Sequence, residues 1–563
     1  MPHRSRLSFT RLLIASLALL FVAGLGQSYA ARYNVGSQNT TYADPYVPRP
    51  GTKPCVVTLF SNVAFDNFNP YNFNYTPPSD CTGPWQKVVF AADISVTKGI
   101  QYDRTANFWI GGANIYFGTT AEPSPQHGPY WHVESDLTDY SPLFTAAQNG
   151  QADIGNLVND QYTGVIYASA KLFFYPIDSK LPAPKPFNVV LPMSAGPDGG
   201  TVTISPTNPQ LAQTFTLPTN ITGAYLDVYA QSQGSNDEFW YTCVPNNLTS
   251  ELESCGNTAF REGEVTIDGQ PAGVSPIYPW IFTGGIDPFL WFPLPGVQTL
   301  NFTPYRVNLT PFVGLLSNGQ PHTVALSVFN AEDFSATATL LLNTDPNVSQ
   351  VTGWITKNNL HANPSPKTTA DIKNSNGDVT GTVSITSQRT FTIAGYAVTS
   401  AGMVTTKVNQ SVNFSNQQGF IINNNEYMQS ISQATDITST TTQVAGGVTT
   451  KTFQQSSYPL VISITDLFNS NGTVNQITTA QQENYSNGNV QVGAHQVSAY
   501  TRDNVVSPTD NLLLTGQFQI ISNSDQSSSQ HYVYFDSTGK CYDLALAAAN
   551  NKLTSFTYNC DNY

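Results

Sequence analysis

The sequence predicts an all-β fold. Segments of about 6–12 residues rich in aliphatic and aromatic side chains alternate with turn residues, as in residues 88–94 and 164–175. The dipeptide Asp268-Gly269 follows a strand-like run and indicates a hairpin. No long stretch shows helical periodicity. With 563 residues, the chain is long enough for roughly three or four domains of about 150 residues each.

The N-terminus is typical of a secretory signal peptide over residues 1–30. Arginines at positions 4, 6 and 11 precede an apolar stretch, 12–26, that is too short to cross a bilayer comfortably. Ser28 and Ala30 place small side chains where signal peptidase requires them, which predicts cleavage after Ala30. An uncleaved anchor is the alternative, but no stop-transfer segment follows. We therefore expect a secreted, extracellular protein with no membrane partner after cleavage.

The remaining chain divides by composition. Prolines at positions 176, 182, 184 and 186 indicate a stiff, extended connection between two strand-rich blocks. Beyond about residue 345, Thr, Ser, Asn and Gln dominate, while aliphatic alternation persists in segments such as 460–464. These patterns predict a lead-in at 31–54, a first β-sandwich at 55–177, a linker at 178–190, a second sandwich at 191–345 and a polar β-rich domain at 346–563.

The charge balance argues against a nucleic-acid partner. Charged residues make up 11% of the chain, the formal net charge is −14, and no basic patch occurs. Nucleic-acid phosphates are bound by clustered Lys and Arg, so we expect no nucleic acid.

Six cysteines in an exported chain favour disulfide bonds. Their proximity in the sequence suggests the pairs Cys55–Cys81, Cys243–Cys255 and Cys541–Cys560, although other connectivities remain open. No spacing typical of zinc sites or of redox pairs occurs. We therefore expect neither a metal nor a cofactor.

Several common catalytic motifs are missing, namely the P-loop, GxGxxG, HExxH and GxSxG patterns. What remains is a set of acids among aromatic residues. Asp103 and Arg104 open an aromatic strand, Glu122 precedes Trp131, and Asp237-Glu238 precedes Trp240. Carbohydrate sites combine aromatic platforms with polar groups, and paired carboxylates can activate water. Ion pairing at a strand start, turn capping and core packing are the ordinary alternatives for these residues.

Seven stretches together resemble the peptide-N4-(N-acetyl-β-glucosaminyl)asparagine amidase A family. They occur in the family's order between about residues 55 and 345, and the region beyond 346 matches more weakly. This resemblance implies two tandem eight-stranded jelly rolls side by side, with the active site in the groove between them. The matching stretches are 103–112, 120–131, 158–165, 236–241, 282–288, 305–312 and 319–323.

A more distant resemblance to peptide-N-glycosidase F suggests roles for single residues. Its Trp-Asp-Arg-Tyr-Ala-Asn-Val-Tyr-Val stretch is similar to residues 103–110, which implies a catalytic Asp103 and a substrate-contacting Arg104. Glu238 is similar to a second catalytic acid of that enzyme. Asp160 is the carboxylate nearest to the position of a third acid. Further candidate substrate-binding residues are Glu122, Trp131, Asp237, Trp240 and Trp280, with the indole rings expected to stack on sugars.

The resemblance implies hydrolysis of the amide between Asn and the first N-acetylglucosamine of N-glycosylated peptides and glycoproteins. The products would be a glycosylamine and a peptide with Asp in place of Asn. Two alternatives stay open. One is a glycoside hydrolase with two carboxylates, and the other is a carbohydrate-binding or adhesive surface protein.

Overall fold

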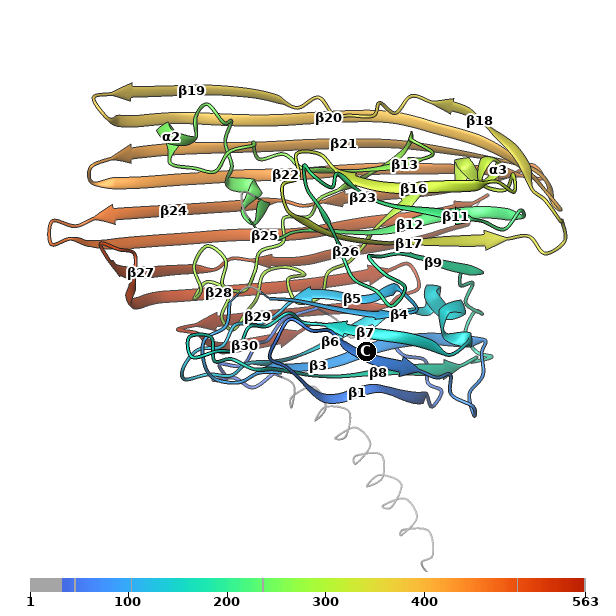
Figure 1. Cartoon of the computed structure of the whole chain (residues 1–563), viewed down its shortest axis with the longest axis horizontal. Helices are drawn as coiled ribbons and strands as arrows, with labels where there is room; N and C mark the ends of the chain where they lie inside the picture. The colour runs from blue at the N-terminus through green and yellow to red at the C-terminus, as the bar shows by residue number, and fades with distance from the viewer. Residues whose placement is uncertain (1–32, 45–46, 103, 235–236, 494, 561–563) are drawn as a thin grey trace, which may run out of the picture.

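The computed structural model describes residues 33–560, apart from 45–46, 103, 235–236 and 494. The predicted all-β fold is confirmed, since strands β1–β30 dominate the described chain (Figure 1). The helices among these residues have at most eight residues each, and none is long and apolar enough to cross a membrane. They are η1 (Thr138–Thr145), η3 (Trp240–Thr242), α2 (Thr249–Leu252), η4 (Thr310–Phe312) and α3 (Val313–Leu316).

The first sandwich consists of two four-stranded antiparallel sheets, ordered β1-β8-β3-β6 and β2-β7-β4-β5. Their inner faces enclose an aromatic core in which Phe60 and Phe108 meet edge to face at 5.4 Å. Alternating inward side chains produce this core because successive residues of a strand point to opposite faces. The strands are β1 (Cys55–Phe65), β2 (Tyr71–Tyr75), β3 (Trp85–Val96), β4 (Thr105–Ile110), β5 (Ala113–Thr119), β6 (Tyr130–Asp136), β7 (Gln148–Asp153) and β8 (Ile166–Pro176).

The second sandwich repeats this arrangement. Its sheets are ordered β10-β17-β12-β15 and β11-β16-β13-β14. The first strand of the second sandwich, β10, therefore has the same position as β1 in the first sandwich, and each following strand up to β17 corresponds in the same way to β2–β8. An additional strand, β9, pairs with β17. The strands are β9 (Val189–Met193), β10 (Val202–Ile204), β11 (Gln210–Thr216), β12 (Ile221–Ser232), β13 (Glu262–Ile267), β14 (Gln270–Pro276), β15 (Tyr305–Asn308), β16 (Pro321–Val328) and β17 (Phe334–Thr344).

The two sandwiches meet along strand β5. The N–H of Thr119 donates to the carbonyl of Thr299 at 2.9 Å, and the N–H of Phe302 donates to the carbonyl of Phe117 at 2.8 Å. The phenol of Tyr116 adds a 2.6 Å bond to the carbonyl of Leu300. Segment 299–302 of the second half therefore runs along the edge of the first sandwich, which holds the two halves side by side.

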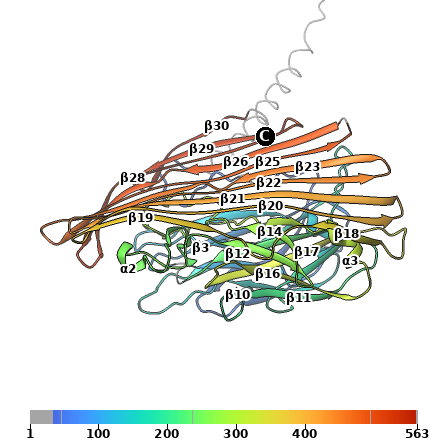
Figure 2. The ribbon, with the colours of Figure 1, turned by 90° about the horizontal axis from the view of Figure 1, so that it is seen from above.

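The C-terminal region forms a 13-stranded antiparallel sheet that covers the second sandwich (Figures 1 and 2). Its strands alternate exposed and buried residues, and the buried face continues the core of the second sandwich, as where Phe414 packs on Phe260 at 5.0 Å. The strands are β18 (Thr352–Asn358), β19 (Lys367–Ser375), β20 (Asp378–Thr399), β21 (Gly402–Asn423), β22 (Glu426–Ala445), β23 (Val448–Ser457), β24 (Leu460–Phe468), β25 (Thr473–Val492), β26 (His495–Val506), β27 (Thr509–Thr515), β28 (Ile520–Asp536), β29 (Cys541–Ala549) and β30 (Lys552–Tyr558).

The three disulfide pairs suggested by sequence proximity are confirmed. Cys55–Cys81 ties the start of β1 to the loop before β3, Cys243–Cys255 closes a loop of the second sandwich, and Cys541–Cys560 joins the last strands. Each links positions 12 to 26 residues apart, so each closes a short local loop.

Candidate active site

The hairpin of β4 and β5 brings two predicted site residues together. The strands pair as far as Thr105 and Thr119, so Arg104 and Glu122 emerge from the same end of the hairpin. There the N–H of Thr120 donates to the carbonyl of Arg104 at 3.0 Å. This end lies next to segment 299–302, at the joint between the two sandwiches.

Asp103 directly precedes Arg104 in the sequence and lies outside the described residues. Its catalytic role therefore stays a prediction that rests on the motif.

A buried amide orients the Arg104 guanidinium. Its Nε donates to Oδ1 of Asn156 at 3.4 Å, and its Nη1 donates to the carbonyl of Tyr102. Asn156 is fully buried, and its Nδ2 donates to the carbonyls of Phe65 and Gly164, each at 2.9 Å. A side chain bonded at both ends of its amide has little freedom, so it holds the guanidinium in one direction.

The sequence predicts a third acid near residues 156–160 but does not single out Asn156. Asp160 is the nearest carboxylate in this stretch, and the structure places it exposed in the same loop. The signal that could have pointed to Asn156 is its place just after β7, beside the matching stretch 158–165.

Glu122 lies against the second sandwich. Its N–H donates to Oγ1 of Thr283 at 3.2 Å, and that hydroxyl donates to the carbonyl of Thr120 at 2.8 Å. A Cβ atom on Gly284 would overlap the Glu122 carboxylate, so the lack of a side chain at Gly284 leaves the carboxylate its space. Motif 282–288 thus meets motif 120–131 directly, although they belong to different sandwiches.

Tyrosines flank this group. Tyr102 is 49% exposed, and its ring meets that of Tyr162 edge-on at 6.2 Å. Burial, followed by the negative charge of Glu122, raises the pKa of Tyr102. Its hydroxyl therefore stays protonated and can donate a hydrogen bond to a polar ligand.

Asp237 serves a structural purpose. Its carboxylate is fully buried and forms an ion pair at 2.7 Å with the equally buried Arg261. The N–H groups of Glu332 and Asp333 donate to its other oxygen at 2.5 and 2.7 Å. These bonds fix the start of the segment that carries Glu238.

Glu238 follows Asp237 and is partly exposed. Burial is the main cause that raises the pKa of Tyr241, and the negative charge of Glu238 adds to it. The Glu238 carboxylate therefore lies within electrostatic reach of the Tyr241 phenol. It belongs to a segment of the second sandwich, whereas Arg104 and Glu122 belong to the first.

The three predicted sugar-stacking tryptophans are buried. Trp131 lies in the core of the first sandwich, Trp240 packs near Phe414 of β21, and Trp280 stacks on Phe302 at 4.3 Å. All three indole rings therefore pack in the hydrophobic core, which is the alternative that the sequence left open. Contact of any of them with sugar stays a prediction.

A cavity of about 450 Å³ lies elsewhere on the first sandwich. Its walls include Asp93, Tyr130, Trp131 and His132 and share no residue with the Arg104–Glu122 group. Within the described chain, no three His, Cys, Asp or Glu side chains gather in a way that could hold a metal ion. The joint itself presents a carboxylate, a guanidinium, phenols and amides.

The fold and this group of residues define a class of protein: paired β-sandwiches with an arginine, a glutamate and tyrosines beside the joint between them. The chain matches the family described as peptide N-acetyl-beta-D-glucosaminyl asparaginase amidase A over residues 45–379. It is also 30% identical over 405 residues to the peptide-N4-(N-acetyl-beta-glucosaminyl)asparagine amidase A of Prunus dulcis, covering 68% of this chain and 69% of the relative. The chain belongs to this family, which confirms the resemblance inferred from its motifs.

Two solved structures are similar at lower identity. PNGF-II is 14% identical with a TM-score of 0.36, covering 52% of this chain and 66% of that chain. PNGase F, a glycosylasparaginase from Flavobacterium meningosepticum, is 13% identical with a TM-score of 0.35, covering 52% of this chain and 96% of that chain.

Proposed function

We propose that this protein is a peptide-N-glycosidase that hydrolyses the amide between Asn and the first N-acetylglucosamine of N-glycosylated peptides and glycoproteins. The observation that carries the proposal is membership of the amidase A family, whose match over residues 45–379 spans both the Asp103-Arg104 and the Asp237-Glu238 motifs. The joint between the sandwiches supports it, because it gathers charged and hydrogen-bonding groups suited to a polar substrate.

In the proposed reaction, the oxygen of water forms a new bond to the Asn side-chain carbonyl, and the C–N amide bond breaks. The nitrogen leaves on the sugar as a glycosylamine, taking up a proton, and the peptide keeps a carboxylate, so Asn becomes Asp. The glycosidic bonds of the glycan stay intact.

The residues would divide this work as follows. Asp103 engages the scissile amide, and Glu238 holds or activates the water. Arg104 favours the ionised form of the adjacent Asp103 carboxylate by its positive charge and contacts the substrate. Glu122 and Tyr102 offer an acceptor and a donor to sugar hydroxyls at the same end of the β4–β5 hairpin.

We also propose export of the chain after removal of residues 1–30. Three disulfide bonds support this proposal, because disulfides persist in oxidising compartments. We further infer that both sandwiches are jelly rolls. In each sandwich the chain crosses repeatedly between the two sheets, and the strand order is the same in both sandwiches.

Incubation of the secreted protein with an N-glycopeptide, followed by mass analysis of the peptide, tests the function. Release of the whole glycan with Asn converted to Asp is the expected result. A peptide that keeps one N-acetylglucosamine would show a glycosidase instead, and an unchanged glycopeptide would favour a binding protein.

Asp103→Asn should abolish turnover without loss of folding, because an amide can neither take up a proton nor attack as a carboxylate does. Asp371→Asn, which changes an exposed carboxylate on β19, is the matched control and should keep full activity. Substantial activity in Asp103→Asn would contradict the catalytic assignment.

A further inference from the structure

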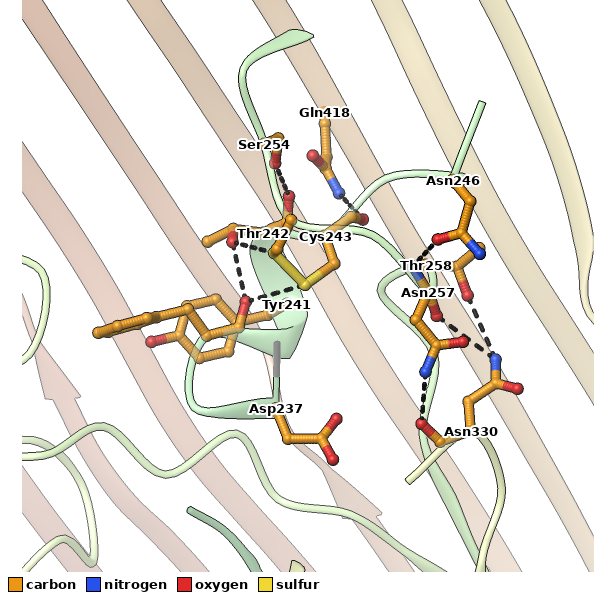
Figure 3. The surroundings of a disulfide bond; sticks show 12 residues. Asp237, Tyr241, Thr242, Cys243, Asn246, Ser254, Asn257, Thr258, Asn330 and Gln418 are labelled. Carbon is orange, nitrogen blue, oxygen red and sulfur yellow. Dashed lines mark hydrogen bonds between the residues drawn. A yellow bond between two sulfur atoms is a disulfide. The ribbon is translucent and has the colours of Figure 1, made fainter. Parts of the chain in front are cut away.

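Three consecutive carbonyls after Glu238 are bonded by side chains of the C-terminal sheet. Nδ2 of Asn416 donates to the carbonyl of Tyr241 at 2.9 Å, and Nε2 of Gln429 donates to the carbonyl of Thr242 at 2.9 Å. Nε2 of Gln418 donates to the carbonyl of Cys243 at 3.0 Å, and Figure 3 shows this side chain reaching the carbonyl from the strands behind. The donors are about 175 to 187 residues away in the sequence.

The donors also bond to one another. Gln429 donates to Gln418 at 2.9 Å, Gln418 donates to Asn416 at 2.9 Å, and Asn416 donates to Gln433 at 3.0 Å. All four side chains are at most 4% exposed. A buried amide without partners is costly, whereas a linked row of amides holds each member in one orientation. We call Asn416, Gln418 and Gln429 the carboxamide row.

The same segment is fixed on its other sides. Asp237 is held by Arg261 and by two backbone N–H groups, and Cys243 is joined to Cys255. Oγ of Ser254 adds a 2.9 Å bond to the carbonyl of Thr242. In the sequence, Glu238 therefore lies between the anchored Asp237 and the anchored segment 241–243, and the C-terminal sheet supplies part of the second anchor.

We propose that the carboxamide row of the C-terminal sheet is a positioning element for Glu238, an inference that rests on the proposed function. Its members touch backbone of the 237–243 segment rather than substrate, so they act through Glu238. A displacement of a catalytic group by about 1 Å can lower turnover roughly 100-fold. Residues that hold the segment of Glu238 in position are therefore expected to affect turnover strongly. The large polar sheet would thus be part of the catalytic apparatus in addition to a cover for the second sandwich.

Gln418→Met in the full-length secreted protein tests the inference. Methionine nearly matches glutamine in shape but cannot donate to the Cys243 carbonyl, so we expect kcat to fall about 10-fold or more. KM should change less than about 2-fold, because substrate-binding groups on the first sandwich are unaffected. The limb of the kcat–pH profile that reports the base should also shift, which a purely structural role would not produce.

The matched control is Gln417→Met. Gln417 is the neighbouring residue of the same type on β21 and points to the exposed face, so its replacement should leave kcat, KM and the pH profile unchanged. If Gln418→Met does not fold, Gln429→Met carries the test, because the Thr242 carbonyl keeps its bond from Ser254.

A folded Gln418→Met or Gln429→Met protein with wild-type kcat and pH profile would overturn the inference alone. A wild-type protein that leaves the glycopeptide unchanged would overturn the proposed function, and the inference with it.

Discussion

Two neighbouring buried carboxyl groups, one in the second half of the catalytic-family region and one in the C-terminal sheet, should make stability depend on pH. Asp287 lies in the 282–288 motif and Asp510 in β27, and both are 0% exposed. One oxygen of each, Oδ2, has no hydrogen-bond partner within the described residues. Burial raises the pKa of Asp287 to about 6. Burial, followed by the charge of Asp287, raises the pKa of Asp510 to about 7.

The direction of the effect follows from these pKa values. Both carboxyl groups bind a proton more tightly in the folded than in the unfolded chain, where the pKa of an ordinary Asp is 3.8. Their contribution to stability is therefore complete below about pH 4 and is lost as the pH rises towards 7. For Asp510 the shift of about three pKa units corresponds to at most about 4 kcal/mol, at about 1.4 kcal/mol per unit.

Asp510→Asn removes one of the two titrating groups while keeping its shape. We expect the variant to be more stable than the wild type at pH 7, by about 2–4 kcal/mol, and similar to it at pH 4. Thermal and urea denaturation at pH 4, 5, 6 and 7 measures the difference.

Asp371→Asn is the control for Asp510→Asn, because Asp371 is an exposed carboxylate on β19 whose charge is not among those that raise the pKa of Asp510. It should leave the pH dependence of the wild type intact. If the difference in stability between Asp510→Asn and the wild type were the same at every pH, the conclusion that burial raises the pKa of Asp510 and thereby lowers stability at pH 7 would be wrong.

Two further substitutions separate structural from functional carboxylates. Asp237→Ala leaves Arg261 buried without its anion and should lower the free energy of unfolding by about 3–5 kcal/mol. Urea denaturation measures the change, with the exposed Asp371→Ala as the control. Equal stability of the two variants would contradict a structural role of Asp237. Gly284→Ala should displace the flexible end of Glu122 and raise KM for glycopeptide with little loss of stability, because the group that must move is a side-chain terminus. An unchanged KM in kinetic assays would argue against a substrate contact by Glu122.

The strands and the disulfides were predictable because both depend on neighbours in the sequence. Alternation along a strand decides which side chains face inward, and the paired cysteines are only 12 to 26 residues apart. The Asp103-Arg104 motif was visible for the same reason, since its residues are contiguous in the sequence.

Roles that depend on distant partners were not predictable. From the sequence alone, Trp240 and Trp280 could form a surface for sugar stacking or pack in the core. Only the structure shows that their rings are buried, near Phe414 and on Phe302 respectively. Likewise, no local pattern in the sequence indicates that Arg261 and the N–H groups of residues 332 and 333 bind the Asp237 carboxylate.

By itself the sequence determined the all-β class, the family and the local motifs, because periodicity, spacing and contiguous residues carry that information. Only the tertiary structure decided that motif 282–288 meets Glu122 and that the polar C-terminal sheet bonds the carbonyls after Glu238. These contacts join residues more than 150 positions apart through single hydrogen bonds, and no local pattern in the chain specifies such a pairing.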